Sequence, residues 1–260
     1  MIFKAIFILL LPLLAFAKIQ VVTYFPLESH LINKIGQQEV ICKDIRGRYT
    51  ETYSELPQSE LTKLANSKIF FHFGLDIEKE YAKILLKQNP SLIIVDISSN
   101  VTKINNNPYI WTDPFNMRIV AKNIFDSFVK VDKYKESYYK QNYEKFLDEI
   151  DETFLKIKQR LHTIDVQNIY VFDSYWDYYG KRFGIGIYTR EKRYININEM
   201  PLVNEFIKEK NIKKLLYTQN SNYDYIRTLN SNMKVEAIED NIFGDIWQLN
   251  LLNLTQNITK

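Results

Sequence analysis

The chain has 260 residues, 46% of them hydrophobic, and its 34 basic and 31 acidic side chains give a formal net charge of +3. That length is enough for one large packed domain or two smaller ones. The near balance of charge, without a basic patch interleaved with aromatic residues, argues against nucleic acid as a partner. Cys42 is the single cysteine, so no intramolecular disulfide can form and stability must come from packing.

The first 17 residues have the features of a secretory signal peptide. Lys4 precedes an apolar run at 5–14, and Ala15-Phe16-Ala17 is typical of a small-x-small cleavage site. The apolar run is too short to cross a bilayer. No cysteine stands at the cleavage point, which argues against a lipoprotein anchor. We therefore expect a periplasmic mature chain that begins near Lys18 and has no membrane span.

Apolar runs alternate with helical periods through the first part of the mature chain, and this predicts a parallel sheet with helices on both faces. The expected strands are 18–25, 39–45, 68–74 and 91–97, and the expected helices are 27–35, 59–66 and 77–88.

A long helix is expected near the middle of the chain. A loop, NNPYIWTDP at 106–114, is followed by a helix at 115–129. Apolar residues then recur every three or four positions from the 130s to about 161, which predicts one amphipathic helix on the order of 45 Å long.

The remainder of the chain repeats the first alternation. Strands are expected at 168–173, 184–189, 213–218 and 235–239, and helices at 175–183, 202–210, 223–229 and 246–258. We expect an α/β protein with an N-terminal lobe at 18–130, a linking helix at 131–163 and a C-terminal lobe at 164–260. A cleft between two such lobes is the usual place for a ligand.

Several segments resemble the substrate-binding subunits of zinc and manganese ABC transporters, the cluster A family of metal-binding lipoproteins and adhesins. The similar segments are VVTYFPLESHLINKIG, LPQSELTKLANSKIFFHFGLDIEKEY, NPYIWTDPFNMRIVAKNI, VDKYKESYYKQNYEKFLDEID and VFDSYWDYYGKRFGI. The resemblance covers nearly the whole mature chain. It implies two lobes on a rigid helix, a metal ion held between them, delivery to an ABC permease, a link to cell adhesion, and no enzymatic activity.

The resemblance also implies four ligand positions. Tyr109 occupies the place of the histidine in the family's Asn-Pro-His-x-Trp-x-Asp-Pro signature. Counting back from Pro57, the first-lobe histidine falls on Glu51. The second-lobe ligand falls on Asp173, and the last-strand aspartate falls on Asp240. All four are oxygen donors, and the charged, histidine-rich loop of the family is missing.

An oxygen-only set has consequences for the metal. Zinc sites favour nitrogen and sulfur, whereas carboxylates suit hard cations. The set favours Mn(II), or Fe(III), which stabilises a phenolate, and Zn(II) stays possible. Three carboxylates in one cleft raise each other's pKa, so a metal must offset them, or else Arg46, Arg48 or Arg190.

Each proposed donor has a structural alternative. Tyr109 is also explained as a core or rim tyrosine, Glu51 as a solvated loop residue, and Asp240 as a turn residue. Asp173 is the better functional candidate because it follows an apolar strand at its carboxyl end. Asp177, one turn later, is expected to be solvated.

The residues around Tyr109 are expected to be structural. Trp111 should pack, and Asp113 should cap the helix that begins at Pro114.

The three histidines do not fall on the family's ligand positions. We expect His72 to be buried and hydrogen-bonded, and His162 to end the long helix, where a cation suits the helix dipole. His30, near the cleft in sequence, is kept as a surrogate ligand.

Three functions follow from these observations. The first is a monomeric periplasmic metal-binding subunit of an ABC importer, and this is the one we favour. The second keeps the fold but uses the cleft for an organic ligand or a protein partner, as the loss of the family's histidines suggests. The third is an enzyme with paired carboxylates, for which the sequence holds no Gly-x-Ser-x-Gly or His-Glu-x-x-His motif.

Overall fold

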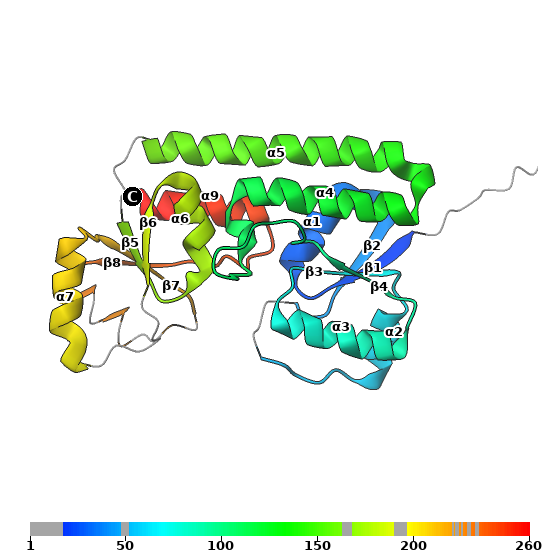
Figure 1. Cartoon of the computed structure of the whole chain (residues 1–260), viewed down its shortest axis with the longest axis horizontal. Helices are drawn as coiled ribbons and strands as arrows, with labels where there is room; N and C mark the ends of the chain where they lie inside the picture. Colours follow the sequence, from blue (N-terminus) through cyan, green and yellow to red (C-terminus); the bar gives the residue numbers. More distant parts are fainter. Residues whose placement is uncertain are drawn as a thin grey trace, which may run out of the picture.

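The computed structural model describes 18–47, 52–162, 168–189, 197–219 and 234–260, with isolated residues between 221 and 231. The expected signal peptide lies outside the described residues, as do Glu51, Arg48, Arg190 and most of the helix expected at 223–229. Two α/β lobes lie toward the two ends of one long helix, α5 (Glu136–His162) (Figure 1).

The first lobe is built on a parallel four-stranded sheet with the order β2-β1-β3-β4. Its strands are β1 (Ile19–Thr23), β2 (Val40–Asp44), β3 (Ile69–His72) and β4 (Ile93–Asp96). Its helices are α1 (Pro26–Gly36), α2 (Gln58–Ala65) and α3 (Asp76–Gln88), with the short 3-10 helix η1 (Gln37–Glu39). In Figure 1, α2 and α3 cover the face of the sheet that is turned away from α5, and α1 lies on the other face.

The second lobe has a parallel sheet of the same topology, with the order β6-β5-β7-β8. Its strands are β5 (Asn168–Val171), β6 (Gly186–Thr189), β7 (Lys214–Tyr217) and β8 (Glu236–Glu239). Its helices are α6 (Asp177–Phe183), α7 (Met200–Glu209) and α9 (Trp247–Ile258), with the 3-10 helices η4 (Ser174–Trp176) and η5 (Ile197–Glu199).

Between the lobes run η2 (Ile110–Thr112), α4 (Pro114–Val131), η3 (Lys133–Lys135) and α5. The buried face of α5 carries Phe146, Ile150 and Ile157 at the spacing expected of an amphipathic helix. This face packs on α1, α4 and α9, so one core runs beneath the helix from lobe to lobe. The sequence-based expectation of parallel sheets and a long helix is confirmed.

No helix in the described part of the chain is both long and apolar enough to cross a membrane.

Candidate cation site between the lobes

Two of the proposed donors lie where strands of the second sheet end. Asp240 directly follows β8, and Asp173 lies two residues beyond β5 as the N-cap of η4. Tyr109 is the N-cap of η2, in the segment that leads from β4 toward α4. Because the carboxyl ends of parallel strands gather at one edge, this placement is the usual one for a ligand site in an α/β lobe.

Tyr109 is half-buried within an aromatic cluster at the junction of the lobes. Its ring meets Tyr175, Trp111 and Phe243 edge to face, with centroids at 4.5, 5.5 and 5.9 Å. Its amide donates to Asn107 Oδ1 at 2.9 Å. We call the six rings of this region the junction cluster; they are Phe25, Phe73, Tyr109, Trp111, Tyr175 and Phe243.

Trp111 is at the centre of the junction cluster and is 1% exposed. Its indole N–H donates to the carbonyl of Ile242 at 3.0 Å, and its own carbonyl accepts from the indole of Trp247 at 2.6 Å. Both partners belong to the second-lobe end of the chain. Trp111 is therefore a packing residue, as expected, and it fastens η2 to the segment that follows β8.

Asp113 is the N-cap of α4, also as expected, because its Oδ1 accepts from the amide of Phe115 at 2.8 Å. The same carboxylate is held by Arg182 of α6 in a two-point ion pair, with Nε and Nη2 at 2.7 and 2.8 Å. This bidentate geometry is the strong form of the pair. The cap therefore also ties α4 to the second lobe.

Asp177 contradicts the expectation that it is solvated. It is half-buried, and its Oδ2 accepts from Asn107 Nδ2 at 3.0 Å, while the same amide also donates to the carbonyl of Ser174 at 2.6 Å. Burial raises the pKa of Asp177, and the hydrogen bond from Asn107 opposes that shift. The expectation failed because the loop partner, Asn107, is far away in sequence.

Asp240 is a buried carboxylate, 8% exposed. The indole N–H of Trp176 donates to its Oδ2 at 2.7 Å. Burial raises the pKa of Asp240 to about 6, while the hydrogen bonds from Trp176 and from the amide of Asn241 act in the opposite direction. No lysine or arginine in the described part of the chain forms an ion pair with it.

The helix η4 connects the three described donors. Asp173, half-buried, stands at its start, the ring of Tyr175 contacts Tyr109, and Trp176 binds Asp240. Among the described residues no group of three or more His, Cys, Asp or Glu side chains is arranged to hold a metal ion. The proposed set contains a phenol, and its fourth member, Glu51, lies outside the described residues, so the full set stays a prediction.

Arg46 has partners within the first lobe. Its Nη2 donates to the hydroxyl of Tyr81 and to the carbonyl of Ser54, both at 2.5 Å, and it also hydrogen-bonds Tyr24. This arginine therefore stabilises phenols of the first lobe instead of offsetting Asp240.

The histidines have separate environments. His30 joins α1 to α9 through a 3.1 Å hydrogen bond between its Nε2 and Gln248 Oε1, and burial lowers its pKa. His72 is buried as expected, but its Nδ1 has no hydrogen-bond partner among the described residues. His162 is the last residue of α5, also as expected.

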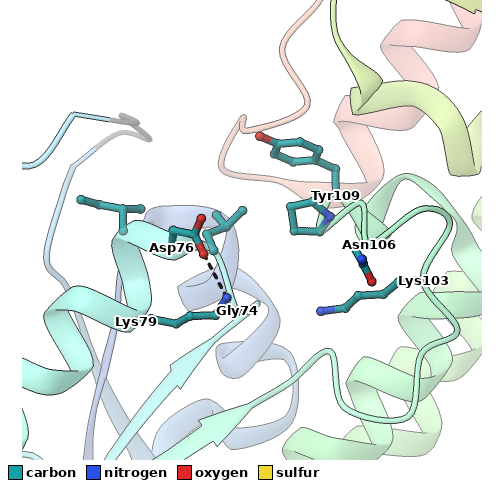
Figure 2. Close-up of a pocket in the computed structure, with 9 residues that line it drawn as sticks. Gly74, Asp76, Lys79, Lys103, Asn106 and Tyr109 are labelled. Carbon is teal, nitrogen blue, oxygen red and sulfur yellow. Dashed lines mark hydrogen bonds and ion pairs between the residues drawn. The ribbon is translucent and has the colours of Figure 1, made fainter. Parts of the chain in front are cut away.

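A cavity of about 560 Å³ opens beside Tyr109. Figure 2 shows Lys79 and Lys103 on opposite walls with their ammonium ends turned toward each other. Lys79 pairs with Asp76 at 3.0 Å, and Lys103 forms no ion pair with a described residue. No local sequence pattern indicates that these two lysines face each other, since Lys79 belongs to α3 and Lys103 to a loop after β4.

The two lobes, the helix that joins them and the strand-end carboxylates define a class: two-lobed substrate-binding proteins of α/β architecture. A family model described as zinc-uptake complex component A, periplasmic, matches residues 21–247. The chain belongs to this family, as the resemblance in sequence implied.

Solved structures agree on the fold. The chain is similar to a crystal structure of ZnuA at 18% identity, with a TM-score of 0.83, over 93% of this chain and 98% of that one. It is similar to a cadmium-bound periplasmic metal-binding protein from Candidatus Liberibacter asiaticus at 16% identity, TM-score 0.79, over 93% and 98%. It is also similar to the periplasmic zinc-binding protein TroA from Treponema pallidum at 14% identity, TM-score 0.76, over 94% and 98%. No curated protein sequence matches the chain.

Proposed function

We propose that the chain is the periplasmic substrate-binding subunit of an ABC importer and binds a metal cation between its lobes. The family match and the two-lobed fold support the class. The observation that best supports a bound cation is the state of Asp240. It is a buried carboxylate at the lobe junction, and its described partners are neutral donors. A carboxylate out of water is costly unless a positive charge compensates it.

The proposed donors divide between the lobes. Glu51 and Tyr109 would present oxygen atoms from the first lobe, and Asp173 and Asp240 from the second. This chemistry favours Mn(II) or Fe(III) over Zn(II) as cargo, because hard cations prefer carboxylate and phenolate oxygens. Binding across the junction would bias the lobes toward one arrangement, and that arrangement would be the loaded form that the permease reads.

The first test is metal-induced stabilisation of the mature protein. We expect a stoichiometric metal in protein purified without chelator, and a rise in melting temperature with one of Mn(II), Fe(III) or Zn(II). A ligand that binds only the native state at 100 times its Kd adds about 2.7 kcal/mol. The rise should disappear in Asp173→Ala.

The control is Asp126→Ala, which removes a carboxylate on α4 whose side chain is 54% exposed. It should keep the full rise. An Asp173→Ala protein that keeps the rise would remove Asp173 from the site.

A second candidate is supported by the cavity beside Tyr109: binding of a small organic anion in a repurposed cleft. Two ammonium groups turned toward each other repel, with one pairing carboxylate, Asp76, beside them. An anion between them would offset that repulsion. Both lysines line the same cavity as Tyr109, a proposed ligand of the cation. The two candidates are therefore distinguished by the charge of the ligand that stabilises the protein.

This candidate predicts a rise in melting temperature with citrate in metal-free buffer. Lys103→Met should lose it, whereas Lys122→Met, at a 52% exposed side chain on α4, should not. If Lys103→Met and Lys122→Met show the same rise in melting temperature, the anion does not bind in this cavity and acts through the charge of the whole surface.

A further inference from the structure

Two glutamates of the first lobe are completely buried and lie outside the proposed cation site. Glu28 and Glu78 are each 0% exposed, and each is the third residue of its helix, α1 or α3. Glu28 Oε2 accepts from the amides of Tyr24 and Phe25 at 2.7 and 3.1 Å. Glu78 Oε2 accepts from the amide of Leu75 at 2.7 Å. Each carboxyl group therefore caps its own helix with one oxygen.

The second oxygens of the two carboxyl groups lack donors. Oε1 of each has no hydrogen-bond partner among the described residues, and the two carboxyl groups lie close enough to share a hydrogen bond once one of them is protonated. Two ionised carboxylates have no donor between them, so this contact needs a proton on one of them. Burial raises the pKa of both groups, and for Glu28 the neighbouring Glu78 raises it further.

The two glutamates lie against the backbone of two aromatic residues of the junction cluster, Phe25 and Phe73. Glu28 accepts from the amide of Phe25, and the carboxyl group of Glu78 lies beside the amides of Phe73 and Gly74, which act to lower its pKa. The rings of Phe25 and Phe73 contact Trp111, with centroids at 6.0 and 4.6 Å. The ring of Phe25 also contacts Phe243 of the second lobe at 5.9 Å. These two rings form the first-lobe wall of the junction.

Few charged groups face the pair. The phenol of Tyr24 lies on one side, where Arg46 is engaged by Tyr24, Tyr81 and Ser54. On the side of Gly74, Asp96 approaches the backbone, and His72 is its neighbour on β3. On the outer face of α3, Asp76 and Lys79 pair with each other. No lysine, arginine or histidine of the described residues forms an ion pair with either glutamate, so a shared proton would offset their repulsion.

We propose that Glu28 and Glu78 act as a proton-dependent positioning pair, in which one shared proton holds the first-lobe wall of the interlobe junction and its loss releases that wall. The two lobes then become less firmly apposed as the proton leaves. This role does not depend on which cargo the cleft takes.

The sign of the pH effect follows from linkage. The ordinary pKa of each group is 4.5, and the native values are raised. The native state therefore keeps a proton that the unfolded chain releases. The stability from the pair is complete below about pH 4.5 and decreases as pH rises through the raised native pKa.

The decisive variant is Glu28→Gln, which supplies the missing donor permanently. Its carbonyl oxygen accepts from the amides of Tyr24 and Phe25, and its NH₂ donates to Glu78. Glu78 can then ionise, because it accepts from the amide of Leu75 and lies beside the amides of Phe73 and Gly74. We expect the infrared band of a buried protonated carboxyl group, which persists in the wild type above the ordinary pKa of 4.5, to be lost in Glu28→Gln.

The positioning role is measured by the distance between the lobes. Spin labels at the exposed Lys63→Cys and Lys208→Cys, in a Cys42→Ser background, report this distance without involving a metal. In the wild type the distance distribution should broaden as the pH is raised through the native pKa of the pair, which lies above 4.5. In Glu28→Gln it should stay as narrow at the higher pH as at the lower.

Two further variants separate positioning from folding. Glu28→Ala removes both the cap and the donor, so it should show the broad distribution at every pH if it folds. Glu80→Gln, at an exposed side chain of α3, should behave as the wild type. The proposal is overturned if the wild-type distribution does not change with pH, or if Glu28→Gln shows the same pH response as the wild type. Both results are read without cation, so they are independent of the outcome for the cation site.

Discussion

Replacing Trp111 by alanine is expected to lower the free energy of unfolding by about 3–5 kcal/mol, the range for a large buried aromatic residue. Its ring contacts four rings of the junction cluster, namely Phe25, Phe73, Tyr109 and Phe243. The change also leaves the carbonyl of Ile242 without its indole donor. Because these neighbours come from both lobes, the remaining cavity cannot close by movement of one lobe alone.

Urea unfolding followed by circular dichroism measures this loss of stability. The variant Trp111→Phe separates the contribution of the ring volume from that of the indole hydrogen bond. Phenylalanine fills most of the space but lacks the N–H, so it should cost about 1–3 kcal/mol, because the carbonyl of Ile242 keeps only its long hydrogen bond from Asn250 Nδ2, at 3.4 Å. Tyr134→Ala, at a 99% exposed ring, should change nothing. A Trp111→Ala loss below about 1 kcal/mol would show that the junction cluster contributes little to the stability of the fold.

The fold was predictable because its signals are local and repeated. The alternation of apolar strands and helices places the strands close to their observed bounds, and the three-and-four spacing predicts α5. Trp111 and Asp113 were also interpreted correctly, since a capping aspartate before a proline is a short-range pattern.

The site was less predictable because its contacts join distant parts of the chain. Asp177 binds Asn107, and Lys103 lies across a cavity from Lys79. The contact between Glu28 and Glu78 needs β1 and β3 to be neighbours, which only the topology of the sheet shows. In sequence each glutamate is an ordinary first-turn residue, where an acidic side chain suits the helix dipole. Burial, which no local pattern reports, is what raises the pKa of Asp177, Glu28 and Glu78.

Replacing Asp240 by asparagine is expected to change stability in opposite directions with and without cation. In the metal-free protein the carboxylate is ionised above about pH 6, at a cost that reflects its raised pKa. The shift from 3.8 to about 6 corresponds to on the order of 3 kcal/mol at neutral pH and above. Asparagine keeps an acceptor for Trp176, but its buried NH₂ group offsets about 1–2 kcal/mol of the gain. We therefore expect metal-free Asp240→Asn to be about 1–2 kcal/mol more stable than the wild type at about pH 8.

The sign of this difference should depend on pH. The native pKa of Asp240 is above that of the unfolded chain, so the wild type loses stability as pH rises through about 6. Asparagine does not titrate, so the advantage of Asp240→Asn should shrink as the pH falls through about 6, reach zero near about pH 5, and become a deficit of about 1–2 kcal/mol below about pH 3, where the carboxyl group is mostly protonated in both states. Denaturant unfolding at a series of pH values, with chelator present, measures this crossing.

With saturating cation the order should reverse, because the wild type gains the stabilisation of binding and Asp240→Asn loses a charged ligand. A residue that matters only for packing would shift both conditions in the same direction, so the reversal distinguishes a ligand from a structural carboxylate. If Asp240→Asn keeps the full cation-induced rise in melting temperature, Asp240 is not a ligand. If the variant is instead less stable than the wild type in chelator at about pH 8, the buried carboxylate has a stabilising partner within the fold, and the argument from an uncompensated charge to a cation fails.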